Sequence, residues 1–166
     1  GALARRLSSE SAAIRAPLTA VSRPAEVPLS YAQRRLWFLD RLESGTGTYV
    51  IPVAVRLTGA LDRVALEGAL NDLVARHESL RTVFPETGGV PRQEVLAAQA
   101  AQLVLEQASV NEAELAEALG TAAGRGFDLA RELPLRAHLF AIESESQTSE
   151  HVLLLVLHHI AGDGWS

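Results

Sequence analysis

The sequence predicts an α/β fold in which helices pack in layers against a mixed β-sheet. Segments with a helical spacing of apolar residues alternate with β-prone segments, and some β-prone segments follow one another directly. Residues 152–157 are an uninterrupted run of Val and Leu, which is typical of a strand buried on both faces. The chain has 166 residues, of which 48% are hydrophobic, so we expect one packed core.

Three helices are predicted, each preceded by a side chain that can cap it. Ser30 and Gln33 have the spacing of a capping box, and the helix that they start should run to about residue 42. Asp62 caps a second helix that ends near Arg76, and Asn111 opens a third that closes at Gly124. The apolar residues expected to face the core are Ala32, Leu36, Leu39 and Leu42, then Leu66, Leu70 and Leu73, then Leu115, Leu119 and Ala122.

The β-prone segments lie between these helices. Pro52 cannot donate to a strand ladder, so the first of them should lie at a sheet edge or carry a bulge. Turn-forming residues at 86–89 separate two short strands, and the polar loop 143–150 joins the last two. The predicted strands cover residues 49–57, 80–84, 92–96, 103–106, 136–142 and 151–157.

Composition excludes several classes of protein. The formal net charge of -5 argues against nucleic acid or an anionic membrane as the main partner. Cysteine is absent, which removes disulfides, thiolate nucleophiles and cysteine-based metal sites. No apolar run approaches the roughly 20 residues of a membrane helix, and no signal peptide is recognisable, so we expect a cytoplasmic location. Because methionine is absent even at position 1, we expect a piece of a longer protein.

Two adjacent imidazoles, His158 and His159, follow the last apolar strand. Neighbouring side chains of a strand point to opposite faces, so one ring can face a cavity while the other faces the interior. We therefore expect different roles for the two. A zinc site is disfavoured, because the two rings diverge and no further ligand cluster is apparent.

Three motifs occur in a fixed order along the chain: SYAQRRLWFL at residues 30–39, RHESLRTVF at residues 76–84, and HHIAGDG at residues 158–164. Together they resemble the first three core motifs of condensation domains from nonribosomal peptide synthetases. The segment FDL at residues 127–129, followed by PLR at 134–136, is similar to the stretch before that family's active-site strand. The resemblance covers residues 29–166.

The resemblance implies a fold like one half of chloramphenicol acetyltransferase. The family has two such halves, and residues 29–166 match only the N-terminal one, so we expect the chain alone to lack turnover. Residues 1–28 resemble the end of an upstream carrier domain and a linker, without that domain's attachment serine. The implied partners are the upstream donor and downstream acceptor peptidyl carrier domains, an adenylation domain and the C-terminal half. No cofactor is expected to bind directly, since the substrates arrive on phosphopantetheine arms.

The resemblance also assigns roles to residues of the last motif. His159 corresponds to the histidine that acts on the acceptor amine, either as a base or by orienting it, and His158 supports it. Asp163 corresponds to a carboxylate that organises the loop, with an arginine partner expected beyond Ser166. The N–H of Gly164 is a candidate oxyanion donor. The cluster at residues 76–78 and Arg81 are expected to be structural.

The function implied is amide bond formation between a donor thioester and the α-amine of an acceptor thioester. Residues 160–162 and 49–52 resemble the subgroup that takes a D-configured donor and an L-configured acceptor. Two alternatives stay open: an epimerisation domain of the same superfamily, and a noncatalytic relative that recruits partner proteins. A heterocyclisation domain is disfavoured, because that subgroup carries aspartate where this chain has its two histidines.

Overall fold

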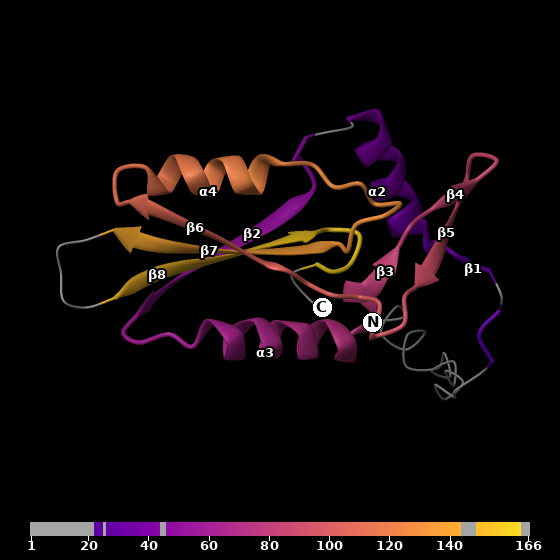
Figure 1. The fold of residues 1–166 in the computed structure, drawn as a ribbon. Helices are drawn as coiled ribbons and strands as arrows, with labels where there is room; N and C mark the ends of the chain where they lie inside the picture. Colours follow the sequence, from indigo (N-terminus) through magenta and orange to yellow (C-terminus); the bar gives the residue numbers. More distant parts are fainter. Residues whose placement is uncertain (1–21, 25, 44–45, 144–148, 164–166) are drawn as a thin grey trace, which may run out of the picture.

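A computed structural model describes residues 22–24, 26–43, 46–143 and 149–163 (Figure 1). Within these residues, helices and strands alternate as the sequence predicts, and two β-sheets form. Residues 2–13, a short segment whose composition is helix-prone, lie outside the described part of the chain. In order, the elements are β1 Val27–Pro28, α2 Tyr31–Leu42, β2 Val50–Thr58, α3 Arg63–Arg76, the 3-10 helix η1 Glu78–Arg81, β3 Thr82–Val83, β4 Glu86–Thr87, β5 Val90–Val95, β6 Leu105–Asn111, α4 Leu115–Gly124, β7 Leu135–Glu143 and β8 Glu150–His158.

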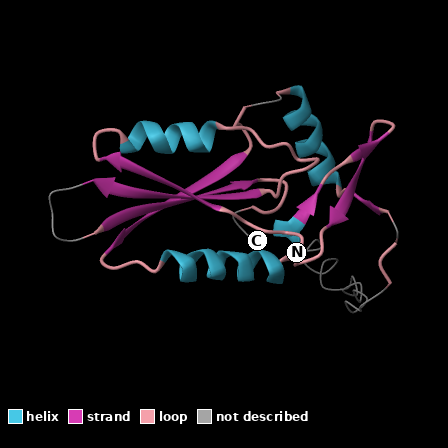
Figure 2. Ribbon diagram, in the orientation of Figure 1, coloured by secondary structure: helices cyan, strands magenta, loops and turns pink. Residues whose placement is uncertain are grey.

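The main sheet has the strand order β2-β8-β7-β6 and is mixed. Strands β6 and β7 are parallel and are connected through α4, whereas β8 pairs antiparallel with both β2 and β7. Helix α4 covers one face of this sheet and α3 covers the other (Figures 1 and 2). The layered α/β architecture is therefore confirmed.

Strand β8 has the central place that its apolar sequence predicts. Val152, Leu154 and Val156 pack into the cluster on the α4 face, which also contains Phe127 and Phe140. Leu153 belongs to a second cluster on the other face, with Leu70 and Val74 of α3. Strand β2 lies at the sheet edge, so Pro52 costs no ladder hydrogen bond on that open side, as predicted.

A smaller sheet is built around β5, which pairs with β1, β3 and β4. The β4–β5 turn is Gly88-Gly89, and both glycines have positive φ, +59° and +81°. A two-residue hairpin turn of this kind requires φ above zero at both positions, which glycine adopts without strain. Strand β1 was not predicted from the sequence.

Several predicted boundaries are wrong. Leu80 and Arg81 belong to η1 rather than to a strand, and β6 covers Leu105–Asn111 instead of 103–106. Because β6 continues to Asn111, helix α4 starts only at Leu115, although the Asn111 side chain still accepts a hydrogen bond from the Glu114 N–H.

Some of the predicted core-facing residues are exposed. Leu73 is 47% exposed and Leu42 is 70% exposed, while Val74, at 0%, faces the core of α3. A row of apolar residues chosen at a fixed spacing drifts around the helix axis. Tertiary packing therefore decides which of two neighbouring residues, such as Leu73 and Val74, is buried.

Candidate active site

The first two motifs and the last one meet in space, although Gln33 and Ala161 are 128 residues apart in the chain. A hollow of about 240 Å³ is bordered by Gln33 of α2, by Ser79 and Phe84 of the second motif, and by Ile160 and Ala161 of the third. The capping box predicted for α2 is present, since Ser30 Oγ accepts from the Gln33 N–H and Gln33 Oε1 accepts from the Ser30 N–H. The motifs therefore build one region of the molecule.

The second motif joins α3 to the smaller sheet. The Arg81 guanidinium donates to the backbone carbonyls of Ala75 and Leu96, and Thr82 Oγ donates to the Glu78 carbonyl at 2.7 Å. Arg23 pairs with the Glu78 carboxylate at 2.5 Å and holds the pKa of that carboxyl below its usual value. These contacts are structural, as the sequence predicts for residues 76–81.

The two histidines of the third motif have opposite environments. The His158 side chain is 1% exposed, whereas His159 is exposed at the end of β8. The backbone N–H of His158 donates to the Pro134 carbonyl, and the backbone N–H of His159 donates to the Tyr49 carbonyl, both at 2.9 Å. The strand alternation predicted this division, and the backbone bonds fix which ring faces outward.

Both ring nitrogens of His158 have a partner. The Ile160 N–H donates to Nδ1 at 3.0 Å, so Nδ1 is the acceptor and the ring hydrogen lies on Nε2. Nε2 is 3.3 Å from Oδ1 of Asp40, a carboxylate on α2 that is itself largely buried. His158 therefore links α2 to the turn at residues 159–161 and fixes where that turn leaves the sheet.

A buried cation supports the other side of the His158 ring. Phe127 meets His158 edge to face, with 5.7 Å between ring centroids, and the Arg136 guanidinium lies 3.7 Å from the Phe127 ring centroid. Arg136 also donates to the carbonyls of Arg125 and Gly126 and pairs with Glu132 at 2.9 Å. Burial lowers the pKa of Arg136 below its ordinary value, and the Glu132 contact opposes this shift.

Asp163 is exposed, and the turn that starts at His159 brings it to the same end of the sheet. Gly164 lies outside the described residues, as do Trp165 and Ser166. Among the described residues no group of three or more His, Asp and Glu side chains is arranged to hold a metal ion. In the same residues, no helix combines the length and the apolar character needed to cross a membrane.

Asp40 was missed from the sequence, although a signal existed. It lies four residues after Leu36 and seven after Gln33, on the side of α2 that contacts the rest of the molecule. A carboxylate on such a face needs a buried partner, but the sequence does not show that His158, 118 residues away, supplies it.

A family model described as "Condensation domain" matches residues 24–166. The chain is 50% identical over 164 residues to the "Probable non-canonical nonribosomal peptide synthetase (NRPS) CymA" of Salinispora arenicola (strain CNS-205), covering 99% of this chain and 2% of that protein.

Two solved structures resemble the fold. The complex of the X-domain and OxyB from teicoplanin biosynthesis gives a TM-score of 0.78 at 40% identity, over 87% of this chain and 30% of the matched one. The first condensation domain of the CDA synthetase gives 0.66 at 20% identity, over 82% and 36%. At that identity the second likeness concerns the fold alone, which is the chloramphenicol acetyltransferase-like fold expected from the sequence. The chain spans about a third of each structure.

Proposed function

The chain belongs to the condensation-domain family of nonribosomal peptide synthetases, and we propose that the complete domain around it joins two carrier-bound substrates through an amide bond. The α-amine of the acceptor aminoacyl thioester attacks the carbonyl carbon of the donor thioester. The C–N bond forms and the C–S bond breaks, so the donor passes to the acceptor. The amine loses one proton, and the sulfur of the donor's phosphopantetheine arm leaves and regains one as a thiol.

His159 is the residue that we assign to the acceptor amine. The observation that carries this assignment is the contrast between its exposed ring and the fully enclosed ring of His158. A neutral imidazole can take up a proton from an attacking amine near neutral pH, or hold the amine in line with the carbonyl. Because the turn at 159–161 is tied to Asp40 through His158, the His159 backbone is held in place before any substrate arrives.

The substrates and one wall of the site come from outside this chain, while Asp163 and Gly164 of this chain have supporting roles. The substrates reach the site on the phosphopantetheine arms of an upstream donor and a downstream acceptor carrier domain, with an adenylation domain adjacent. The C-terminal half of the domain closes the passage in which they meet. Asp163 organises the loop after His159, and the Gly164 N–H stabilises the developing oxyanion. The cytoplasmic location stays a prediction.

We expect the 166-residue chain alone to form no amide. It spans 30% of the matched chain in the X-domain complex, so the wall opposite His159 is supplied by other residues. Adding the chain to loaded donor and acceptor carriers should give no product above the uncatalysed rate, whereas the full-length synthetase should. Product formation by the chain alone would contradict this expectation.

For the stereochemical subtype, we propose a D-configured donor and an L-configured acceptor. Of the two segments behind this assignment, residues 49–52 pair at Val50 with His158, and Val50 packs against the apolar cluster that contains Ile160 of the segment 160–162. Loading the donor carrier with each epimer separately tests it. The D epimer should give the faster amide formation, and a preference for the L epimer would contradict the proposal.

A noncatalytic role in recruiting a partner protein is the second candidate. It is favoured by the likeness to an X-domain whose structure was solved with OxyB bound. The adjacent histidines at 158 and 159 and their supporting contacts favour the catalytic role. An epimerisation domain would use the same histidine to move the proton at the substrate α-carbon.

One experiment separates the three functions. The full-length synthetase is loaded with a donor on one carrier and an α-deuterated aminoacyl group on the next, and the carriers are then analysed by intact mass. Amide formation predicts that the acceptor carrier gains the donor mass and keeps its deuterium. Loss of deuterium without mass transfer would indicate epimerisation, and carriers that stay unchanged would indicate a noncatalytic role.

A further inference from the structure

The loop between α4 and β7, residues 125–134, lies against the buried histidine of the third motif. It carries Phe127, which is 7% exposed and meets the His158 ring at an interplanar angle of 79°. The loop passes beside α2, and Trp37 and Asp40 of that helix border a hollow of about 720 Å³ together with Phe127 (Figure 1). The loop is therefore next to the link between α2 and the turn at residues 159–161.

Phe127 restrains the ring of His158 in a way that its hydrogen bonds do not. The ring nitrogens are bound to Asp40 and to the Ile160 N–H, and a hydrogen bond keeps much of its strength when it is bent by about 30°. A perpendicular ring at 5.7 Å limits the tilt that these two bonds permit. Since the Ile160 N–H follows directly after His159, a tilt of the His158 ring would move the backbone of the active-site turn.

Arg136 of β7 holds Phe127 in this place. The residue is 7% exposed, and its guanidinium lies 3.7 Å from the Phe127 ring centroid. The same group donates to the carbonyls of Arg125 and Gly126, the two residues directly before Phe127. A planar guanidinium can present its face to a ring and its N–H edges to carbonyls, which an ammonium group cannot do. Arg136 therefore fixes both the ring of Phe127 and the backbone that carries it.

We propose that Phe127 and Arg136 are positioning residues for the reaction at His159. Arg136 holds Phe127 against His158, and His158 transmits the restraint to the turn through the Ile160 N–H. This inference rests on the proposed role of His159 in amide formation. Both side chains are buried, so they act through His158 and not on a substrate. Their loss should lower kcat by about tenfold to hundredfold and leave the KM for the loaded acceptor carrier unchanged.

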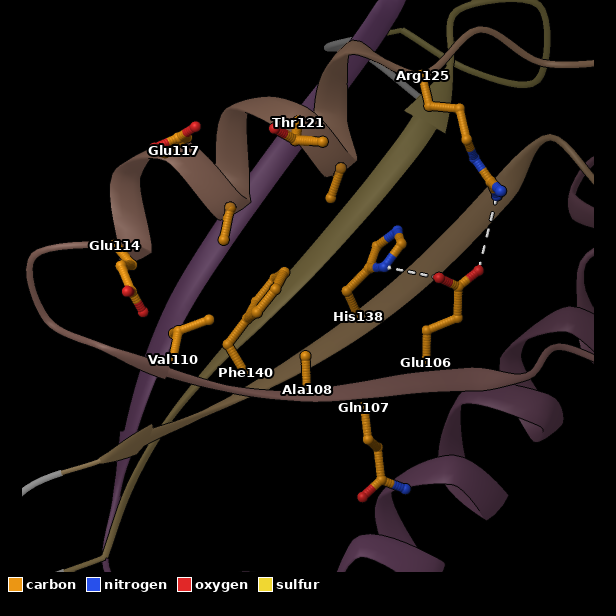
Figure 3. Close-up of a pocket in the computed structure, with 12 residues that line it drawn as sticks. Glu106, Gln107, Ala108, Val110, Glu114, Glu117, Thr121, Arg125, His138 and Phe140 are labelled. Atoms are coloured by element: carbon orange, nitrogen blue, oxygen red, sulfur yellow. Dashed lines mark ion pairs between the residues drawn. The ribbon is translucent and has the colours of Figure 1, made fainter.

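The test compares Phe127→Leu with Phe140→Leu in the full-length synthetase. Phe140 belongs to the same apolar cluster and is 6% exposed, but it pairs with Val152, six residues before His158 in β8. It lies beside His138 at a cavity of about 650 Å³ between α4 and the sheet (Figure 3). Both substitutions remove the same atoms from one cluster, so they should lower the thermal unfolding temperature similarly. Only Phe127→Leu should lower kcat, and equal kcat values for the two variants would overturn the proposal.

Arg136→Lys tests the second residue and does not depend on the folding of Phe127→Leu. It keeps the positive charge but cannot stack on the Phe127 ring and bind both carbonyls at once. We expect the same fall in kcat with an unchanged KM. A wild-type kcat in Arg136→Lys would contradict the proposal.

Combination with His159→Ala separates this inference from the proposed function. If Phe127 acts through His159, the double variant should be no slower than His159→Ala alone. A further fall of the same size as in Phe127→Leu would show an effect independent of His159 and would overturn the inference. A wild-type rate in His159→Ala would contradict the proposed function itself, whereas a slow His159→Ala beside a normal Phe127→Leu would contradict only the positioning role.

Discussion

His158 uses both of its ring nitrogens inside the protein, and this defines what the residue can do. Nδ1 accepts from the Ile160 N–H and Nε2 donates to Asp40, so the ring has no lone pair left for a substrate. The exposed neighbour, His159, is held through its backbone N–H, which donates to the Tyr49 carbonyl. That bond does not use the ring nitrogens of His159. At the scale of single residues, one histidine is a structural link and the other is presented outward.

Removing the Asp40 partner should weaken both stability and turnover. In Asp40→Ala the Nε2–H of a side chain that is 1% exposed loses its acceptor, which costs about 1–3 kcal/mol of unfolding free energy. Asp40→Asn keeps a carbonyl acceptor and should recover most of that loss. Urea unfolding of the complete domain, together with its amide-forming rate, measures the effect.

Asp72→Asn is the control for that series, because Asp72 is exposed on α3. It should leave both measurements within error of wild type. If Asp40→Ala behaved like the Asp72 variant, the contact between Asp40 and His158 would contribute neither to the unfolding free energy nor to the rate.

The packing of the loop before β2 against the end of α4 helps to set the position of the turn at residues 159–161. Gly47, in the loop before β2, approaches the end of α4 so closely that a Cβ would lie 2.8 Å from the Ala123 carbonyl oxygen and 2.9 Å from Gly124 Cα. The same loop leads to Tyr49, whose carbonyl holds the His159 N–H. The end of α4 therefore sets the position of a strand partner of the active site.

Gly47→Ala should destabilise the domain by about 1–3 kcal/mol, since the clash is with backbone and cannot be relieved by a rotamer. Gly68→Ala is the matched substitution within helix α3, where a Cβ meets nothing within 4 Å. It should stabilise by about 1 kcal/mol, because alanine is the better helix former. Opposite signs of the two changes in thermal unfolding are expected. A neutral or stabilising Gly47→Ala would contradict the close approach.

The side of α3 that faces the core is also testable. Val74→Ala removes buried methyl groups and should cost about 2 kcal/mol, whereas Leu73→Ala, at a half-exposed site, should cost about 0.5 kcal/mol. Chemical denaturation of the two variants decides between the stripe expected from spacing and the packing observed. A larger loss for Leu73→Ala would support the stripe.

The sequence predicted the elements that have strong local signals. These elements depend on residues that lie close together in the chain. They are the caps of α2 and α3, the apolar run of β8 and the edge position of Pro52. What it could not predict depends on distant pairs. The short strand β1 exists only because β5 pairs with it, and Asp40 is explained only by His158. The three motifs carried the family resemblance, and their meeting point is visible only in the fold.

At the scale of the whole molecule, the cavity beside α4 predicts a pH dependence of stability. Burial lowers the pKa of His138 from its ordinary value of 6.5, against the opposing effect of Glu106 and with small contributions from Arg125 and Arg136. The unfolded state then binds more protons than the folded state below pH 6.5. The stabilising effect is complete above pH 6.5 and is lost as pH falls towards the folded pKa.

His138→Phe should therefore flatten the fall in unfolding free energy that occurs as the pH drops below 6.5. Leu73→Ala gives the control, since it changes a half-exposed side chain without a titratable group and should keep the wild-type slope. Urea unfolding of the complete domain at a series of pH values measures both. An unchanged slope in His138→Phe would mean that folding does not lower the pKa of His138.

The role of His159 at the acceptor amine is tested by the single-turnover rate of amide formation. The full-length synthetase is loaded on both carriers and quenched at intervals, for wild type, His159→Ala and the exposed control Asp72→Ala. His159→Ala should lower the rate by about 10²–10⁴-fold, the usual contribution of a positioned general base, while Asp72→Ala should stay at the wild-type rate. A His159→Ala rate within about twofold of the wild-type rate would contradict a role for His159 in the reaction of the acceptor amine.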